Sequence, residues 1–395
     1  MMLIGIVGKP NTGKSTFFKA LTLMDVLIEN YPFATIKPNR GMGHVRVKCV
    51  DSEFGVKCNP RNGFCMNGTR YVGVEVMDVA GLVPGAHEGK GMGNQFLDDL
   101  RQADAFIHVI DVSGATNEKG EVIALGAYDP ANDIRFLEEE LDYWFFGILK
   151  KTWAKFARML EQGNKELVKE IANQFSGLKI TEEHVRAAIE GFNTNRPAEW
   201  TDEDLFRFCS RLRKLSKPMV IAANKVDKSN GKENLERLKK LFPDYKIVGC
   251  SAEVELALRQ ANNNGVIKYA PGENDFEIVK QDLPDKLKGA LDFMKKFLKD
   301  FGSTGIQEIM DYIVFDYLKY IAVFPGGTKG LVDSHGRVLP DCFLLRNGST
   351  ALDFAFSIHT DLGDKFIKAI NVKTRQVLGK AYELKHRDVI EIITS

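Results

Sequence analysis

A glycine-rich octapeptide that directly follows a short apolar run constrains the fold of this chain more than any other feature. Residues 8–15 read Gly-Lys-Pro-Asn-Thr-Gly-Lys-Ser and match the pattern G-x-x-x-x-G-K-[ST] at every position, after Leu-Ile-Gly-Ile-Val over 3–7. Glycines let several backbone N–H groups of such a loop converge on one anion, and a following helix directs its N-terminus at the same anion. The sequence therefore predicts a strand, a phosphate-binding loop and a helix over 14–23.

The side chains of this loop have expected roles at a nucleoside triphosphate. Lys14 is placed to reach the β- and γ-phosphates, and the Ser15 hydroxyl can ligate Mg²⁺. A chance glycine-rich turn is the alternative interpretation, which the flanking strand and helix patterns disfavour. The residues expected to contact the nucleotide here are Gly8, Lys9, Pro10, Asn11, Thr12, Gly13, Lys14, Ser15 and Thr16.

Two further motifs follow in the order that a nucleotide-dependent switch requires. An apolar run over 71–77 ends at Asp78-Val-Ala-Gly81, in which the carboxylate can hold Mg²⁺ through water and the Gly81 N–H can meet the γ-phosphate. A second apolar run, over 218–223, ends at Asn224-Lys225-Val226-Asp227. A single N-K-x-D could be a polar turn, but its position downstream of the other two motifs favours a base-binding role.

The Asp227 carboxylate gives this motif its predicted specificity. It can accept two hydrogen bonds, from the N1–H and the exocyclic amine of guanine, and adenine lacks this pair of donors. After the next strand-like run, over 245–249, Ser251 and Ala252 can offer a backbone N–H to the guanine O6. The four motifs together predict GTP or GDP, with Mg²⁺, as the ligands.

The composition is that of a globular protein of two or three domains. The chain has 395 residues, of which 44% are apolar, and 54 Lys or Arg balance 53 Asp or Glu. The formal net charge of +1 gives no overall attraction to nucleic acid or to a membrane. The sequence shows no run of about 18 apolar residues and no signal peptide, so we expect a cytoplasmic monomer that makes no membrane contact.

Six cysteines are spread along the chain, at positions 49, 58, 65, 209, 250 and 342. In a cytosolic protein most cysteines remain thiols. Cys49, Cys58 and Cys65 lie in or beside the turn-rich stretch 51–69, with His44 upstream, and could ligate a metal ion or form a disulfide. Their spacing matches no common zinc motif, so free thiols are the favoured interpretation and metal ligation stays open.

Several other segments resemble the Obg-related GTPases, and in particular their YchF branch. They include Asn-Tyr-Pro-Phe-Ala-Thr over 30–35 and the glycine-rich tract over 81–97. The segments 339–345, 348–353 and 358–363 resemble the TGS domain, the β-grasp module of that branch. The resemblance covers nearly the whole chain. It implies an α/β fold with a Ras-like P-loop GTPase core, in which helices cover both faces of a mostly parallel sheet, followed by a C-terminal β-grasp domain.

The family pattern also implies roles for single residues. Thr35 would close onto Mg²⁺ and the γ-phosphate when GTP is bound. Asn11 falls where some relatives hold a potassium ion against the phosphates, although a simple turn residue after Pro10 would look the same. The residues expected to act on the reacting γ-phosphate are Lys14, Thr35 and Gly81, and the residues expected to hold the metal are Ser15, Thr35 and Asp78.

Two departures from related proteins carry information. The usual YchF proteins lack an intact N-K-x-D and prefer ATP, whereas this chain retains the motif at 224–227, so we expect an archaeal-type relative that uses GTP. The residue after Gly81 is Leu82, where many small GTPases carry a glutamine, and leucine cannot orient the attacking water. Slow intrinsic hydrolysis follows. His87 is the nearest titratable side chain, and such residues are more often solvated than catalytic.

The distance from Asp78 to Asn224 exceeds the need of a minimal GTPase, whose βα units take about 30 residues each. Apolar residues over 133–160 recur at helical spacing. Helices are also predicted over 165–175, 181–191 and 201–215, the last two with threonine caps, and further along the chain over 283–300 and 306–320. The predicted domains are a GTPase domain over 1–113 and 217–325, a helical insertion over 114–216 and a TGS domain over 326–395.

Charge is uneven within the predicted TGS domain. Seven Lys or Arg and one acid, Glu383, lie between 365 and 387, whereas 326–364 carries three basic and five acidic residues. A basic face fits RNA phosphates, and a solvated surface is the plain alternative. With the resemblance, this predicts a GTPase switch that associates with the ribosome or its RNA in translation or ribosome biogenesis. The alternatives are an ATP-hydrolysing YchF-type protein and an RNA-binding scaffold with a structural nucleotide.

Overall fold

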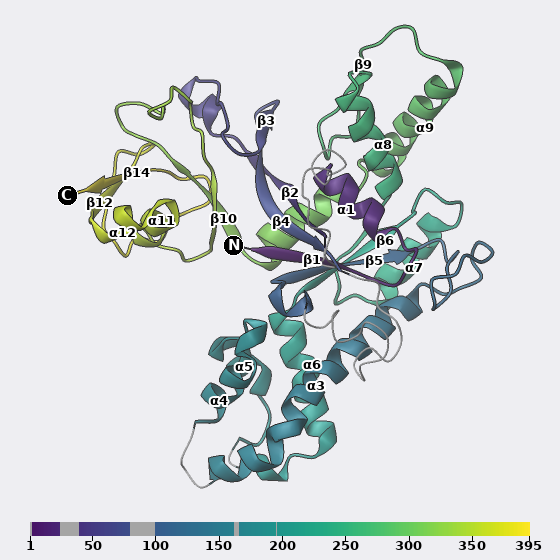
Figure 1. The fold of residues 1–395 in the computed structure, drawn as a ribbon, viewed down its shortest axis with the longest axis vertical. Helices are drawn as coiled ribbons and strands as arrows, with labels where there is room; N and C mark the ends of the chain where they lie inside the picture. The colour runs from purple at the N-terminus through teal and green to yellow at the C-terminus, as the bar shows by residue number, and fades with distance from the viewer. Residues whose placement is uncertain (1, 24–38, 80–98, 162–165, 195) are drawn as a thin grey trace, which may run out of the picture. The chain divides into compact units, whose positions relative to one another are not determined.

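The computed structural model describes residues 2–23, 39–79, 99–161, 166–194 and 196–395. The chain forms two compact units, one from 1–41 with 75–309 and one from 42–74 with 310–395 (Figure 1). No helix in the described residues has the length and apolar character that crossing a membrane requires.

A mostly parallel β-sheet forms the centre of the first unit, as predicted. The strand order is β2-β4-β1-β5-β6-β7, with β3 paired to β4, and the residues of β2, β3 and β4 between 42 and 74 belong to the second unit. β1 pairs in parallel with β4 and β5, and β6 and β7 continue the parallel series. The strands are β1 Leu3–Val7, β2 Asn39–Lys48, β3 Phe64–Met66, β4 Thr69–Asp78, β5 Ala105–Asp111, β6 Met219–Asn224 and β7 Ile247–Cys250.

The carboxyl ends of these strands meet at one edge of the sheet. Every residue of β1, β5 and β6 is buried, which is typical of parallel strands covered on both faces. The register aligns Asp111 with Asn224, and Asn224 with Cys250. The predicted phosphate loop and the N-K-x-D motif therefore emerge side by side, at the edge where open α/β sheets bind ligands.

Four helices lie between β5 and β6 in the described chain. They are α3 Ala131–Glu161, α4 Leu167–Gln174, α5 Glu182–Ile189 and α6 Asp202–Ser216. α6 packs against both α3 and α5, and the apolar stripe predicted on α3, which includes Leu137, Phe145 and Trp153, is buried. Thr181 and Thr201 cap α5 and α6 as predicted, each accepting a hydrogen bond from a backbone N–H of the first turn.

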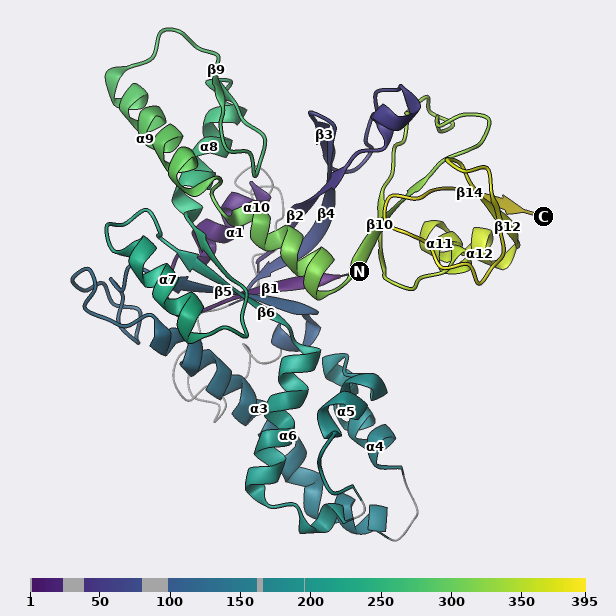
Figure 2. The same cartoon turned by 180° about the vertical axis from the view of Figure 1, so that it is seen from behind.

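The remaining helices of the first unit complete the layers around the sheet. They are α1 Lys14–Thr22, α7 Gly231–Leu241, α8 Ala252–Asn263 and α9 Asp285–Phe301, and α10 Ile306–Asp311 begins in this unit and ends in the second. α1 packs against α8, on the opposite side of the strands from α3 and α6 in both views (Figures 1 and 2). A two-stranded sheet, β8 Ile267–Lys268 with β9 Glu277–Ile278, follows α8.

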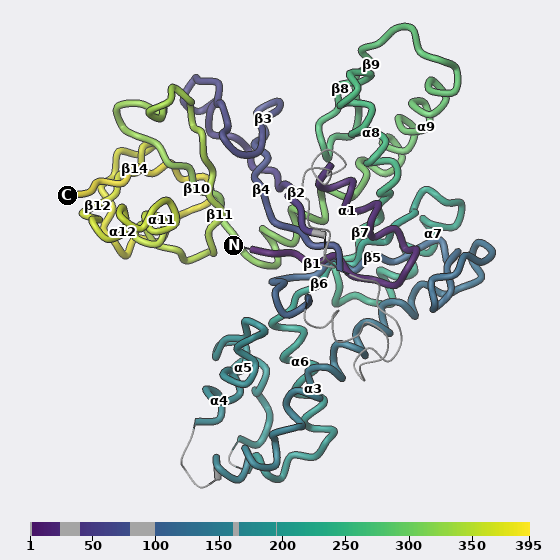
Figure 3. The backbone as a smooth tube through the Cα atoms, in the orientation of Figure 1, coloured from purple at the N-terminus to yellow at the C-terminus, as the bar shows by residue number. Residues whose placement is uncertain are grey.

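The second unit contains a β-grasp domain, as the TGS resemblance implies. Its five-stranded sheet has the order β11-β10-β14-β12-β13, and Val323, Phe354 and Ile390 belong to its core. Figure 3 traces the backbone of this sheet. The elements are β10 Tyr320–Pro325, β11 Phe343–Arg346, α11 Ala351–Ile358, α12 Thr360–Asp364, β12 Phe366–Asn371, β13 Val377–Leu378 and β14 Val389–Thr394.

The helix predicted over 306–320 is wrong at its C-terminal end. α10 is followed by a π-helical turn, Tyr312–Tyr317, and the chain enters β10 at Tyr320. Aromatic and β-branched residues dominate 320–324, and these favour a strand when a neighbouring strand is available to pair. β10 pairs with both β11 and β14, so the β-grasp sheet begins before residue 326.

Candidate nucleotide-binding site

The phosphate loop starts where β1 ends and is closed by α1. Gly8 and Gly13 have φ angles of 145° and 98°, which side chains rarely tolerate. A Cβ on Gly8 would lie 2.3 Å from the Val109 carbonyl oxygen, and a Cβ on Gly13 would lie 2.3 Å from Asn224 Nδ2. Both glycines are therefore required by the packing of the loop itself, in addition to the access that phosphates need.

Asn224 connects the N-K-x-D motif to the phosphate loop. Its buried amide donates from Nδ2 to the Thr12 carbonyl at 2.9 Å and accepts at Oδ1 from the Ala252 N–H at 3.0 Å. Ser251 caps α8, because its hydroxyl accepts from the Val254 N–H. One side chain thus holds the phosphate loop against the start of α8.

Lys225 lies over the same loop and depends on an aspartate that the sequence analysis missed. Its Nζ donates to the Asn11 carbonyl at 3.0 Å and pairs with Asp111 at 2.8 Å. Asp111 is buried at the end of β5 and accepts from the hydroxyls of Ser113 and Thr116 at 2.5 and 3.2 Å. The sequence contained a signal for Asp111, because it is an acidic residue at the end of an apolar strand. The same signal identified Asp78 of the D-x-x-G motif.

Lys14 is a buried cation that pairs with no carboxylate in the described part of the chain. Its Nζ donates to the Lys9 carbonyl at 2.8 Å. Burial lowers the pKa of Lys14 to about 8, and the charge of Asp78 partly opposes this shift. A buried ammonium that has only carbonyl partners would be stabilised by an anion, and the phosphates of a nucleotide would supply one.

Ser15 and Asp78 lie together and fit a magnesium ion. Ser15 Oγ donates to Asp78 Oδ2 at 3.1 Å, while Asp78 Oδ1 is buried without a hydrogen-bond partner among the described residues. Burial raises the pKa of Asp78, against the effects of the Ser15 hydrogen bond and the Lys14 charge. Mg²⁺ takes oxygen ligands and keeps several waters, so a hydroxyl beside a carboxylate with an unused oxygen suits it. When bound, Mg²⁺ would neutralise charge on the phosphates.

Lys9 occupies a variable position of the motif, yet it is 3% exposed and fully engaged. Its Nζ pairs with Asp133 at 2.9 Å, donates to the Thr116 carbonyl at 2.8 Å and lies 3.9 Å from the centre of the Tyr128 ring. The partners come from the segment between β5 and α3 and from the first turn of α3. Lys9 therefore fixes the phosphate loop to the beginning of the inserted helices.

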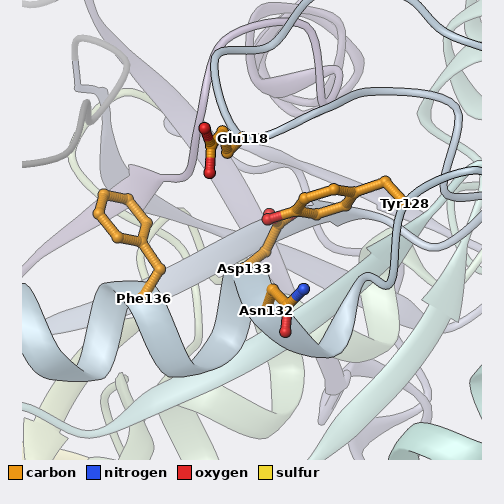
Figure 4. Close-up of a pocket in the computed structure, with 5 residues that line it drawn as sticks. All are labelled: Glu118, Tyr128, Asn132, Asp133 and Phe136. Carbon is orange, nitrogen blue, oxygen red and sulfur yellow. The ribbon is translucent and has the colours of Figure 1, made fainter.

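Asp133 also lines a pocket of about 200 Å³ beside this ion pair (Figure 4). Burial raises the pKa of Asp133 to about 6, although the Lys9 charge opposes the shift. The residues that line the pocket are Glu118, Tyr128, Asn132, Asp133 and Phe136.

Pro10 and Asn11 contact the segment between β5 and α3 on a second side. Asn11 Nδ2 donates to the Gly120 carbonyl at 2.8 Å, and a Cβ on Gly120 would lie 2.6 Å from the Pro10 carbonyl oxygen. Asn11 itself has a φ of 62°. The side-chain nitrogen Nδ2 of Asn11 is thus engaged, while its side-chain oxygen Oδ1, the atom that a cation would need, makes no hydrogen bond to described residues.

Of the groups expected to bind the guanine base, only some are free of hydrogen bonds within the described part of the protein. Asp227 is 10% exposed at its side chain, and its carboxylate lies 3.3 Å from Lys228 Nζ. The Ser251 N–H donates to the Thr304 carbonyl at 3.1 Å, and the Ala252 N–H is held by the asparagine of the motif. Both N–H groups expected to reach the guanine O6 are therefore engaged within the protein, whereas the carboxylate keeps unused acceptor capacity.

The remaining predicted residues fall into two groups. The Thr12 hydroxyl is buried and donates to the Lys9 carbonyl at 3.1 Å, and Thr16 is half-buried in the first turn of α1. The residues that lie outside the described part of the chain are Thr35, Gly81, Leu82 and His87.

A strand–loop–helix cradle, a serine–aspartate pair and an N-K-x-D motif bound to the loop together define the nucleotide site of a P-loop GTPase. Three family models match the chain in the corresponding order. They are a 50S ribosome-binding GTPase over 3–137, the Obg-like GTPase YGR210-like, G4 motif-containing domain over 222–326, and the TGS domain over 332–394.

Individual relatives agree with these models. An uncharacterized GTP-binding protein of Methanocaldococcus jannaschii is 50% identical over 100% of both chains. The ribosome-binding ATPase YchF of Mycoplasma genitalium is 34% identical over 62% of this chain and 63% of its own length. The solved structure of a GTP binding protein from Pyrococcus horikoshii OT3 is 38% identical over 100% of both chains, with a TM-score of 0.77. The chain belongs to the YchF branch of the Obg-like P-loop GTPases.

Proposed function

We propose that this chain binds GTP with Mg²⁺ and hydrolyses GTP slowly, as a switch that acts at the ribosome. The observation that carries the nucleotide part is the double hydrogen bond of Asn224, to the Thr12 carbonyl and to the Ala252 N–H. Because it joins the phosphate loop to the base-binding motif, a guanine held by Asp227 would have a fixed position relative to phosphates held by Lys14.

In this proposal each residue has a distinct task. Lys14 exchanges the Lys9 carbonyl for the β- and γ-phosphates, and Ser15 with Asp78 holds Mg²⁺. Thr35 and Gly81 contact the γ-phosphate when GTP is bound. Leu82 cannot hydrogen-bond a water molecule, which accounts for the slow intrinsic rate.

The experiment for the base is competition of GTP, XTP and ATP for one site in the wild type and in Asp227→Asn. The substitution should weaken GTP by about 2–4 kcal/mol, or roughly 30- to 1000-fold, because it removes one of two acceptors and the charge. The affinity for XTP should increase, since the new amide can donate to the xanthine C2 carbonyl, and the affinity for ATP should change little. Asp244→Asn, at an exposed loop aspartate, is the matched control. GTP binding within about threefold of wild type would favour the ATP-using alternative.

The ribosome part rests on basic residues of the second unit. Lys373 and Arg387 pair with Glu53, and Arg375 donates to the Thr328 carbonyl, so these three take part in internal contacts. Other basic residues between 365 and 387 are exposed and pair with no acid among the described residues. They are Lys365, Lys368, Lys380 and Lys385. RNA phosphates are the expected partners for such a group.

Replacing these four lysines by glutamate should reduce co-sedimentation with ribosomal particles and make it less dependent on salt, while GTP affinity stays unchanged. The matched control changes four exposed lysines of α9, namely Lys286, Lys288, Lys296 and Lys299. Point changes suit this test better than truncation at 326, because β10 is part of the same sheet. Unaltered association would move the RNA contact to the helices between β5 and β6.

Potassium is a further part of the proposal. The side-chain oxygen Oδ1 of Asn11 could hold the ion against the phosphates, where the ion would stabilise charge that develops between them. Hydrolysis should then be faster in potassium chloride than in sodium chloride at equal ionic strength, and Asn11→Ala should remove the difference. Equal rates in the two salts for the wild type would contradict the role of Asn11.

A further inference from the structure

Three cysteines and one aspartate converge at the end of β2. The sulfur atoms of Cys49, Cys58 and Cys65 and a carboxylate oxygen of Asp51 all lie within 4.8 Å of one another. Cys49, Asp51 and Cys58 are buried, and Cys65 is half-buried on β3. All four belong to the second compact unit, and along the chain they lie between the phosphate loop and Asp78.

We propose that these four side chains bind one Zn²⁺. At a tetrahedral zinc with Zn–S bonds of about 2.3 Å, two thiolate sulfurs lie about 3.8 Å apart. The Cys49 and Cys58 sulfurs are 3.6 Å apart, so they need to move little to share an ion. A disulfide between these two would use only half of the group and would leave Cys65 and Asp51 facing it without a role.

The local backbone explains why the ligand spacing matches no common zinc motif. Cys49 directly follows β2, and its N–H donates to the Gly68 carbonyl in the turn between β3 and β4 at 2.8 Å. Asp51 opens a 3₁₀ turn, Asp51–Phe54, and Cys65 returns on β3. The four ligands thus come from a strand end, a turn, a loop and a neighbouring strand, and only their fold brings them together.

The aspartate is already oriented for ligation by its backbone partners. Asp51 Oδ1 accepts from the Ser52 N–H at 2.8 Å, and Oδ2 accepts from the Cys58 N–H at 3.4 Å. Hydrogen bonds of this kind around a ligand fix its direction and support metal affinity. On binding, Zn²⁺ would replace the three thiol protons, which pass to solvent, and no electron transfer takes place.

The proposed ion would be structural, because the loop that it holds packs on the β-grasp domain. The Asn59 N–H donates to the Val338 carbonyl at 2.8 Å, and the Arg61 N–H donates to the Pro340 carbonyl at 2.9 Å. Glu53 pairs with Lys373 at 2.7 Å. A loop with few apolar residues can keep one shape if a metal ion crosslinks it.

The test measures zinc in the full-length chain, purified under reducing conditions without chelator. About one zinc per chain is expected, and replacement by Co²⁺ should give thiolate-to-cobalt charge-transfer bands and the visible bands of a tetrahedral ion. Cys58→Ser and Cys65→Ser should lose both signals. Cys342→Ser removes a cysteine of the same unit outside the cluster and should keep them.

A second measurement on the wild type keeps the test independent of variant folding. Chelation should make the 49–65 loop more sensitive to protease, and added Zn²⁺ should restore its resistance. A wild-type chain that takes up neither Zn²⁺ nor Co²⁺ when fully reduced would overturn the proposal. A Cys49–Cys58 disulfide that is present in the chain after purification under reducing conditions would also overturn it. So would retention of zinc in a double variant that carries Cys58→Ser and Cys65→Ser.

Discussion

Replacing Asn224 by alanine should destabilise the chain even when no nucleotide is present. The side chain is 3% exposed, and it makes hydrogen bonds of 2.9 Å to the Thr12 carbonyl and 3.0 Å to the Ala252 N–H. Its loss leaves both backbone groups without these partners. A buried backbone group left unsatisfied costs about 1–3 kcal/mol. Because water can rehydrate part of the site, we expect the two groups together to cost about 2–4 kcal/mol.

The tryptophans of the chain offer a direct assay. All three, Trp144, Trp153 and Trp200, lie between β5 and β6 in the first unit, so their fluorescence reports the unfolding of the unit that holds the nucleotide site. A loss of 2–4 kcal/mol should lower the Tm by about 4–12 °C for a unit of this size. Asp227→Asn, in the same motif, is the control and should stay within about 2 °C of wild type, because the lysine that pairs with this aspartate, Lys228, is about half exposed and such pairs contribute little to stability.

Binding separates the two variants further. Asn224→Ala should weaken GTP and inorganic triphosphate alike, since it releases the phosphate loop, whereas Asp227→Asn should weaken GTP alone. An unaltered Tm for Asn224→Ala would refute the reasoning, because the hydrogen bonds would then add nothing to the nucleotide-free fold. Full triphosphate affinity in that variant would place Asn224 at the base only.

Three further outcomes are expected. Lys14→Ala should abolish GTP binding in calorimetry, and unchanged affinity would contradict the phosphate-loop assignment. The cationic form of Lys14, with a pKa of about 8, is the form that phosphates favour, so GTP affinity should fall up to about tenfold between pH 7 and 9, and a flat profile would contradict this. Asp133→Asn should cost about 3–5 kcal/mol in urea unfolding because it leaves Lys9 buried without a counter-charge. The double variant Lys9→Met with Asp133→Leu should recover most of the lost free energy of unfolding. If Asp133→Asn alone is as stable as wild type, the buried pair is excluded.

The parts of this molecule that were predictable depend on neighbours in the sequence. The phosphate loop, the threonine caps at Thr181 and Thr201 and the apolar stripe of α3 each follow from a pattern within a few turns or strands. The end of the helix predicted over 306–320 could not be judged in this way. There distant strands decide, because residues 320–323 pair with β11 and residues 324–325 pair with β14 near the end of the chain.

The contacts that hold the nucleotide site together were not predictable for the same reason. Lys9 reaches Asp133 and Lys225 reaches Asp111 across more than a hundred residues, and nothing local marks a lysine in a variable motif position as buried. Asp51 likewise joins the cysteine cluster only because a 3₁₀ turn aims its carboxylate at the three sulfurs.

The helices between β5 and β6 have a consequence for how proteins of this kind can diversify. β5 and β6 pair directly, from Phe106 with Met219 to Asp111 with Asn224, although these helices separate them along the chain. α3 has 31 residues and is about 46 Å long. Asp133, which pairs with Lys9 of the phosphate loop, lies in its first turn. Whole helical turns can therefore be gained or lost at its far end without disturbing a residue that holds the nucleotide. The inserted helices can thus vary in length among related chains while the residues of the nucleotide site stay in place.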